Sequence, residues 1–349
     1  MTETWSIHEL IHKVGRGGRG ARDLTRDEAR HMAERMYRRD LTDAQLGAFL
    51  LAERMKGETA EEVHAFIETW RAHAPSWPAH LLPEALDVAG GYDGRTKTFC
   101  ASVAAAVLAA DLGVKQFLHG SLPLPPKYGL TVGEVLSALR VSAVRAESHA
   151  DRHVRVGIVF LDTESWLSPL AELRSVREQL GLRTFIHSVE KLINPGRSEY
   201  RIVGAFHRPA FERYAAVCEL DGVRRCVLIQ GVEGSEDPYP NRATSVYVFD
   251  GHRWNIEAFD PRPYGLEADP TCPPDADLQA RYTESVLAGE KSSYARWAVW
   301  SAAVRLFARG AAVSLDEAVE RVRDHWRTGR AEGRLKQWQH SEWLAPHAG

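Results

Sequence analysis

The amino-acid sequence predicts an α/β protein with two domains, a small N-terminal α-helical bundle and a larger α/β domain with a central mixed sheet. Three observations support this prediction. About the first 75 residues carry helical patterns only, prolines interrupt the chain at 75–85, and short apolar runs separated by helical segments follow. This alternation is typical of α/β domains. We expect domains at 1–79 and 80–349, with the segment near 165–195 packed against the bundle.

The N-terminal helices are predicted from a repeated capping pattern. A threonine stands three residues before Glu or Gln in Thr25 and Glu28, in Thr42 and Gln45, and in Thr59 and Glu62. In such a capping box, each side chain accepts a hydrogen bond from the other residue's backbone N–H. Apolar residues at helical spacing follow each box, as in "LTDAQLGAFLLAERMKGE". Three short amphipathic helices joined by tight turns form a small bundle.

The second domain is predicted from its apolar runs. Five of them have the length and composition of buried strands, at residues 114–119, 154–161, 201–206, 224–231 and 244–250. The chain closes with two predicted helices, over 294–310 and 314–338.

Composition limits the class of protein. Of the 349 residues, 44% are hydrophobic and 26% are charged, which is ordinary for a soluble globular protein. The formal net charge of −3 argues against a uniformly basic nucleic-acid binder but leaves a local basic face open. The four cysteines have no metal-binding spacing, and no signal peptide or membrane-length apolar run stands out. We expect a soluble cytoplasmic protein with reduced thiols.

One loop has the composition of a phosphate-binding turn. The stretch "DVAGGYDGRTKTFCASVAAA" at 87–106 combines glycines, Asp93 and Arg95 with Ser102 at the start of an alanine-rich helix. Backbone N–H groups at a helix N-terminus, reached through a glycine-rich loop, bind phosphate. The spacing differs from the familiar phosphate loops. A tight strand-to-helix turn is therefore the alternative interpretation.

An ordered set of motifs resembles the anthranilate phosphoribosyltransferase family (glycosyl transferase family 3). The motifs are "LTDAQLGAFLLAERMKGET", "DVAGGYDGRTKTFCASVAAAVLAADLGVKQFLHG", "LGLRTFIHSVEKLINP", "VLIQGVEGSED" and "VLAGEKSSYARWAVWSAAVRLFARG", and the likeness covers roughly residues 5 to 335. The resemblance implies the nucleoside phosphorylase/phosphoribosyltransferase type of fold and a homodimer formed through the helical domains. It implies a cleft between the domains that binds phosphoribosyl pyrophosphate with magnesium. The reaction would join the ribose to anthranilate in tryptophan biosynthesis. Pyrimidine nucleoside phosphorylases share this fold, so their activity is a further possibility.

The resemblance also implies which residues bind the phosphoribosyl ligand. The family's Gly-Thr-Gly-Gly-Asp-Gly loop corresponds to "AGGYDG", in which Tyr92 departs from the pattern. The phosphoribosyl and phosphate-binding candidates are Gly90, Gly91, Asp93, Gly94, Arg95, Ser102, Gly120 and Lys127. A tyrosine in this loop obstructs close approach of a phosphate, or could stack on a base.

Metal and acceptor sites follow from the same resemblance. Ser102, Glu236 and Asp237 correspond to magnesium-binding positions, with the two acids in reversed order, and carboxylate oxygens suit this ion. His119, Arg183 and His187 correspond to the acceptor site, where an arginine would pair with the anthranilate carboxylate. Little acid–base chemistry is required, so no catalytic residue is assigned. Each of these side chains could instead have a structural role.

A second functional hypothesis comes from a divergent branch of the family. "VGRGGRGARDLTRDEAR" and the tyrosine-containing loop resemble the branch typified by the bacterial protein YbiB. Its characterised members share the fold but bind nucleic acid and have lost the phosphoribosyl transfer, which implies a non-catalytic homodimeric nucleic-acid binder. Residues 12–39 hold nine Lys and Arg against four acids. Lys13, Arg16, Arg19 and Arg22 could contact single-stranded nucleic acid, and a solvated helix face is the alternative.

Overall fold

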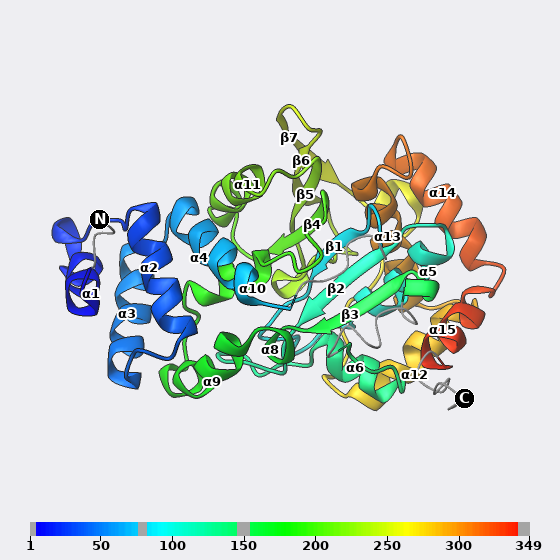
Figure 1. Cartoon of the computed structure of the whole chain (residues 1–349). Coiled ribbons are helices and arrows are strands. Elements are labelled where there is room, and N and C mark those ends of the chain that lie inside the picture. The colour runs from blue at the N-terminus through cyan, green and yellow to red at the C-terminus, as the bar shows by residue number, and fades with distance from the viewer. Residues whose placement is uncertain (1–4, 76–81, 145–153, 341–349) are drawn as a thin grey trace, which may run out of the picture.

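The computed structural model describes residues 5–75, 82–144 and 154–340, and it places an N-terminal helical bundle beside a larger α/β domain (Figure 1). The bundle helices are α1 (Ile7–Gly15), α2 (Arg26–Tyr37), α3 (Asp43–Lys56) and α4 (Ala60–His73). Helix α9 (Ser168–Leu180) packs against α2 and α3, although it lies far along the chain. The expected boundary at residues 79 and 80 lies outside the described residues.

Capping boxes begin the bundle helices. The three predicted boxes of α2, α3 and α4 are confirmed. In α2, the backbone N–H of Glu28 donates to Thr25 Oγ1 at 3.3 Å, and the backbone N–H of Thr25 donates to Glu28 Oε2 at 2.7 Å. A fourth box, formed by Ser6 and Glu9, begins α1. This helix was not singled out from the sequence.

Seven strands form one mixed sheet in the order β3-β2-β1-β4-β5-β6-β7. They are β1 (Leu86–Ala89), β2 (Gln116–Gly120), β3 (Ile158–Asp162), β4 (Tyr200–Ala205), β5 (Arg225–Gln230), β6 (Thr244–Phe249) and β7 (Trp254–Phe259). The first five are parallel, whereas β6 and β7 are antiparallel to their neighbours. The mixed sheet is thus confirmed. The sequence missed β1 and β7, and residues 154–156 are helical rather than the start of β3.

The remaining helices flank the sheet. They are α5 (Ala101–Asp111), α6 (Val132–Ala138), α8 (Thr163–Trp166), α10 (Ile186–Leu192), α11 (Ala210–Leu220), α12 (Ala276–Leu287), α13 (Ser293–Arg309), α14 (Leu315–Trp326) and α15 (Ala331–His340). The segment 314–338, predicted as one helix, is two. Gly329 adopts a left-handed φ of 65° between them, which glycine does at no steric cost.

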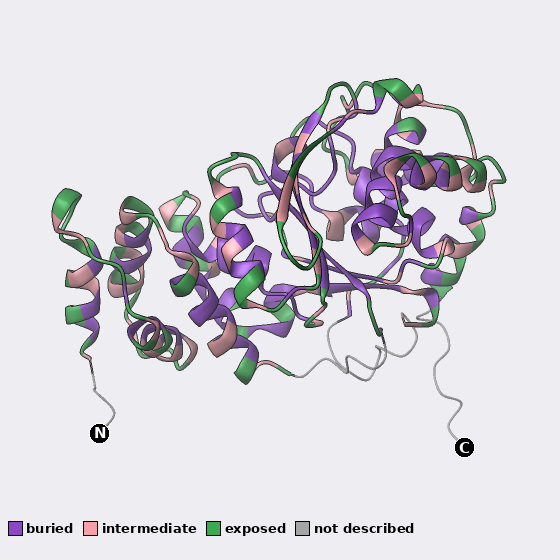
Figure 2. Cartoon of the chain, turned by 90° about the horizontal axis from the view of Figure 1, so that it is seen from above, coloured by how far each residue is buried: buried purple, intermediate pink, exposed green. Residues whose placement is uncertain are grey.

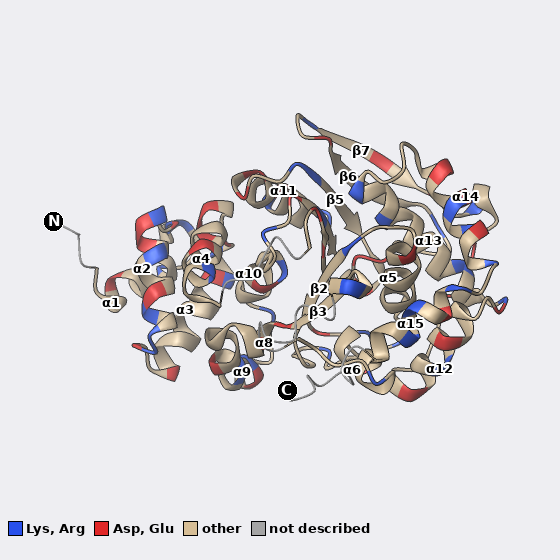
Figure 3. Ribbon diagram, turned by 45° about the vertical axis from the view of Figure 1, so that its right-hand side comes forward, with Lys and Arg blue, Asp and Glu red and all other residues tan. Residues whose placement is uncertain are grey.

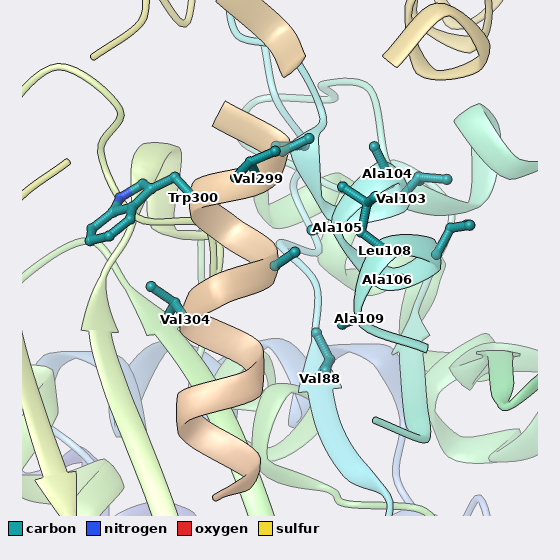
Figure 4. Close-up of a cluster of buried hydrophobic side chains, with 14 of the residues drawn as sticks. Val88, Val103, Ala104, Ala105, Ala106, Leu108, Ala109, Val299, Trp300 and Val304 are labelled. Carbon is teal, nitrogen blue, oxygen red and sulfur yellow. The ribbon is translucent and has the colours of Figure 1, made fainter. Parts of the chain in front are cut away.

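Side chains of the parallel strands alternate between two cores, one on each face of the sheet. Figure 2 shows buried residues along the sheet and on the helices beside it. Leu118 and Ile202 pack with α5 and α13 on one face. Figure 4 shows these two helices side by side, with Val88 of β1 beside them. Phe117 and Val203 point to the opposite face and join the apolar core of the helical bundle. One continuous core therefore connects the bundle to the sheet.

No described helix combines the length and the apolar character that a membrane span requires. All four cysteines are free and buried.

Candidate functional site

A cleft of about 790 Å³ opens at the carboxyl ends of β1, β4 and β5. Residues 91–93, 205–207 and 233–234 line it from the strand side, and parts of the segments 54–58 and 182–191 line it from the helical side. The chain leaves β1 toward β2 but returns from β3 to β4, on the other side of β1. The strand order therefore reverses between β1 and β4, and α/β sheets bind ligands at such a switch point.

The cleft is lined by both signs of charge. Four basic and three acidic residues contribute, namely Arg54, Arg183, Lys191, Arg213, Glu58, Asp93 and Glu233. The structure thus brings Gly91, Asp93, Arg183 and His187, which the sequence singled out, to one cleft. Lys191 and Glu233 were not singled out from the sequence. Lys191 lies within the mostly buried α10, and Glu233 follows β5 by three residues. A charged residue inside or shortly after a buried apolar run is the signal that could have marked them.

The glycine loop after β1 is held by a second segment. Gly94 has a φ of +68°, and a Cβ atom there would lie 2.0 Å from the carbonyl oxygen of Gly129. The backbone N–H of Gly129 donates to the Asp93 carbonyl at 2.9 Å, and that of Arg95 donates to the Leu130 carbonyl at 2.8 Å. A side chain at position 94 would collide with this crossing, so only glycine fits.

Tyr92 turns into the protein beneath the cleft. Its hydroxyl donates a hydrogen bond to the Glu190 carbonyl of α10, and only 3% of the residue is exposed. Burial raises the pKa of this phenol well above its ordinary value. The side chain therefore fastens the loop to α10, and a base could stack on little of its ring.

His119 lies below Tyr92 and not among the residues that line the cleft. Its Nδ1 atom is 3.4 Å from the Tyr92 hydroxyl, and its Nε2 atom is 3.2 Å from Asp87 Oδ1. Asp87 also accepts from Arg201 Nε at 3.0 Å. Burial acts to raise the pKa of Asp87, but the charges of Arg201 and His119 lower it overall. His119 belongs to this buried cluster.

Arg183 reaches into the cleft and pairs with Asp93. Its Nε atom donates to Asp93 Oδ2 at 2.9 Å, and Nη2 donates to the same oxygen. Lys127 Nζ lies 3.3 Å from Asp93 Oδ1 and donates to the Gly94 carbonyl at 2.8 Å. The Arg183 side chain remains 41% exposed. It is therefore oriented by Asp93 and still accessible to a ligand.

Three further candidates have mainly backbone surroundings. Gly90 donates its N–H to the His119 carbonyl at 3.2 Å, and Gly120 ends β2. His187 lines the cleft, where its Nδ1 atom accepts from the Thr184 N–H at 3.1 Å. Burial, and then the positive charges of Arg177 and Arg183, lower the pKa of His187 well below its ordinary value. His187 is therefore a neutral imidazole at physiological pH.

Lys191 of α10 is buried at the cleft. Its Nζ atom donates to the carbonyls of Gly204 at 2.7 Å and Gly234 at 2.8 Å. Burial lowers its pKa to about 8. The Glu233 carboxylate accepts from the N–H of Thr96 at 3.0 Å and from Thr98 Oγ1 at 2.7 Å, on the other side of the glycine loop.

Glu236 and Asp237 form a buried cluster behind the glycine loop. Ser102, at the start of α5, donates its hydroxyl to Glu236 Oε1 and, at 3.1 Å, to Asp237 Oδ2. Arg95 Nη2 donates to Asp237 Oδ2, and Arg305 Nη2 donates to Glu236 Oε1 at 2.9 Å. All five residues are at most 5% exposed. Arg305, a buried arginine of α13, was not singled out from the sequence.

Comparison with known families supports the fold. The α/β domain of the glycosyl transferase family matches residues 82–332, and its helical bundle domain matches residues 8–74. The chain belongs to this glycosyl transferase family. The match covers both domains, as the resemblance of the motifs predicted.

Relatives of known sequence include anthranilate phosphoribosyltransferases. An uncharacterized protein of Aquifex aeolicus is 31% identical over 319 residues, which cover 90% of this chain and 97% of that protein. The anthranilate phosphoribosyltransferase of Myxococcus xanthus is 31% identical over 342 residues, covering 95% and 97%. That of Persephonella marina is 26% identical over 323 residues, covering 91% and 94%.

Solved structures share this fold. The anthranilate phosphoribosyltransferase of Thermus thermophilus superposes with a TM-score of 0.82 at 22% identity, covering 96% of this chain and 98% of that one. The enzyme of Saccharomyces cerevisiae, in complex with PRPP (phosphoribosyl pyrophosphate) and Mg, gives 0.78 at 18% identity, covering 96% and 97%.

The magnesium expected from the family was tested against the residues present. Ser102, Glu236 and Asp237 do lie together, as predicted, but two guanidinium groups already neutralise both carboxylates. The described residues include no group of three or more His, Cys, Asp or Glu arranged for a metal ion. In this arrangement the cluster does not fit a magnesium site.

The expected nucleic-acid surface lies on the first helices. Six of the nine basic residues at 12–39 form ion pairs, and Figure 3 shows acidic and basic residues interspersed over α2 and α4. Lys13 pairs with Glu28 at 2.5 Å. Arg16, Arg19 and Arg22 are exposed around a short 3-10 turn at Gly18–Gly20. The glycine-rich segment therefore has local structure, with three arginines facing solvent.

Proposed function

We propose that the chain is a phosphoribosyltransferase-type protein whose cleft binds a phosphorylated ribose ligand such as phosphoribosyl pyrophosphate. The observation that carries this proposal is the position of the cleft, at the switch point of the sheet with Arg54, Arg183 and Arg213 on its lining. Phosphate and carboxylate groups pair well with guanidinium groups. The yeast relative in complex with PRPP has the same fold, which supports the choice of ligand class.

Arg183, which the family resemblance assigns to the acceptor carboxylate, is the leading residue for an anionic group of either substrate. Its two hydrogen bonds to Asp93 use Nε and Nη2, which leaves Nη1 for an anionic group in the cleft. Arg54 Nη1 donates to the Arg183 carbonyl and so links the end of α3 to this part of the lining. An anion that enters the cleft therefore meets a guanidinium whose orientation is already determined.

The reaction proposed for this site is pentosyl transfer. The bond between ribose C1 and the pyrophosphate oxygen breaks, and pyrophosphate leaves with the bonding electrons. An amine acceptor, anthranilate in the named relatives, forms the C1–N bond and releases a proton to solvent. Such a step depends on orientation of the amine and on donors that stabilise the departing charge. Lys191 and Arg183 are the cations available for that role.

Calorimetric titration with phosphoribosyl pyrophosphate tests the binding. We expect heat at millimolar ligand or below. Arg183→Ala should weaken binding by about tenfold, because it removes a guanidinium and leaves Lys127 as the remaining cation beside the Asp93 carboxylate. Arg281→Ala, on the exposed surface of α12, is the matched control and should bind as the wild type does. Absence of heat with the wild type at millimolar ligand would contradict the proposal.

Turnover is tested separately, by release of pyrophosphate in the presence of anthranilate. Product formation that Arg183→Ala reduces supports transfer to this acceptor. Binding without turnover would support the proposed ligand but contradict transfer to anthranilate, and with it the role in tryptophan biosynthesis.

Nucleic-acid binding remains the second candidate, favoured by one observation. Arg16, Arg19 and Arg22 are exposed on a single short segment, whereas the rest of the basic run is paired. A salt-dependent gel shift with single-stranded oligonucleotides, repeated after all three arginines become alanine, tests it. Nucleic-acid binding that is unchanged in the triple variant would exclude this surface as the binding site.

The homodimer formed through the helical domain also stays a prediction, and light scattering would measure the oligomeric state.

A further inference from the structure

We propose that the cleft binds its anionic ligand without a divalent metal ion, because the guanidinium groups of Arg95 and Arg305 occupy the cation position at Glu236 and Asp237. The ligand part of this inference rests on the proposed function. The metal part does not, because it concerns the charge and the geometry of residues that are present in the protein itself.

The cluster is neutral as it stands. Two carboxylates carry two negative charges, and the two guanidinium groups supply two positive ones. Arg305 Nη2 also lies 4.0 Å from Asp237 Oδ1, so it contacts both acids. The charge of Asp237 helps to keep Arg95 protonated: burial acts to lower the pKa of Arg95, yet the pKa lies above its ordinary value.

A magnesium ion would need an open site rich in oxygen. Mg²⁺ requires six ligands in near-octahedral geometry and usually keeps several waters. The cavity beside Arg95 and Glu236 measures about 10 Å³, close to what a single water needs. A further double positive charge next to two buried guanidinium groups would also be repelled. The ion could enter only if Arg95 left.

Arg95 is held too firmly for such an exchange to be easy. Besides Asp237, its Nη1 atom donates to the Phe99 carbonyl at 3.2 Å. Its guanidinium lies 5.7 Å from the centre of the Trp297 ring, within the range of a cation–π contact. Displacing it would remove the hydrogen-bonded partner of the buried Asp237 carboxylate and lose all three interactions.

The protein therefore has to meet the ligand's negative charge with side chains of its own. Arg183, Lys191 and Arg213 on the cleft lining can do this without a metal ion. We expect the affinity for phosphoribosyl pyrophosphate to be similar with magnesium and with EDTA.

The first experiment measures the metal alone. Calorimetric titration of the wild-type protein with MgCl₂ should give no binding heat up to millimolar concentration. Arg95→Ala should gain magnesium binding, because it leaves Asp237 with an open oxygen and a larger cavity. Arg281→Ala should behave as the wild type does. Magnesium binding by the wild-type protein that Glu236→Gln or Asp237→Asn abolishes would overturn the inference, and this arm needs no arginine variant that folds.

The second experiment measures the ligand. Affinity for phosphoribosyl pyrophosphate is compared in magnesium and in EDTA, with the yeast anthranilate phosphoribosyltransferase as the positive control. A difference within about twofold supports the inference, whereas a tenfold gain with magnesium, about 1.4 kcal/mol, would overturn it. If the ligand binds in neither buffer, the proposed function fails. The metal part is then judged by the magnesium titration alone.

Discussion

At the scale of single residues, Tyr92 shows how one side chain changes the glycine loop. A phenol in a phosphate-binding turn obstructs the ligand if it points outward. Here its hydroxyl donates to the Glu190 carbonyl, and the ring is almost fully buried. The loop is thus compatible with a ligand in the cleft, and the tyrosine strengthens its attachment to α10.

Lys191 provides a prediction at the same scale. Burial lowers its pKa to about 8. Between pH 8 and the ordinary value of 10.5, the unfolded chain binds more protons at this group than the folded protein does. The free energy of unfolding therefore rises with pH across this window. Denaturant unfolding at pH 7 and 9.5 should show the wild type gaining about 1–2 kcal/mol relative to Lys191→Met.

Lys336→Met is the control for this measurement. Lys336 is exposed on α15 and pairs only with Glu332, four residues earlier. Its removal should leave the pH dependence of stability unchanged. An equal dependence in the wild type and in Lys191→Met would mean that Lys191 keeps its ordinary pKa.

At the scale of the element, helix caps were the most dependable signal. The capping boxes of α2, α3 and α4 appear where the threonines predict them, because the pattern requires only residues three apart. Strand β1 was missed because it has four residues. Its neighbours β2 and β4 supply its hydrogen bonds, and those strands come from distant parts of the chain.

The cap of α3 gives a prediction for this scale. The hydroxyl of Thr42 accepts the backbone N–H of Gln45 at 3.3 Å, and the site is exposed. Thr42→Ala should lower the free energy of unfolding by about 1 kcal/mol, because the N–H loses its partner. Thr42→Ser keeps the acceptor and should cost only a few tenths of this. Equal losses in both variants, measured by chemical denaturation, would exclude the cap as the cause.

At the scale of the whole molecule, the helical bundle and the sheet share one apolar core. The ring centroids of Phe66 in α4 and Phe185 are 4.9 Å apart. The same apolar core includes Val203 of β4. Arg71 of α4 donates to Asp221 Oδ2, at the end of α11, at 3.1 Å. Burial acts to raise the pKa of Asp221, but hydrogen bonds and the charges of Arg71 and Arg201 lower it overall.

Arg71→Ala should therefore destabilise the whole molecule. It leaves the Asp221 carboxylate buried without this partner, a change that costs about 3–5 kcal/mol. Arg26→Ala is the matched control, because Arg26 pairs with Glu68 at a half-exposed site and should cost less than about 1 kcal/mol. Calorimetry should show one unfolding transition for the wild type and for both variants. Separate transitions of the bundle and the α/β domain would contradict the continuous core.

The sequence by itself determined what depends on local pattern. Helix caps, buried strands and sequence motifs can each be recognised from a short stretch of residues. The helices, most of the sheet and the family were therefore predictable. The tertiary structure decided what the charged residues do. Glu236 and Asp237 looked like metal ligands, but Arg305 and Arg95 reach them from 69 and 142 residues away. Folding brings these opposite charges together in the buried interior, where they neutralise one another, and no local pattern contains that information.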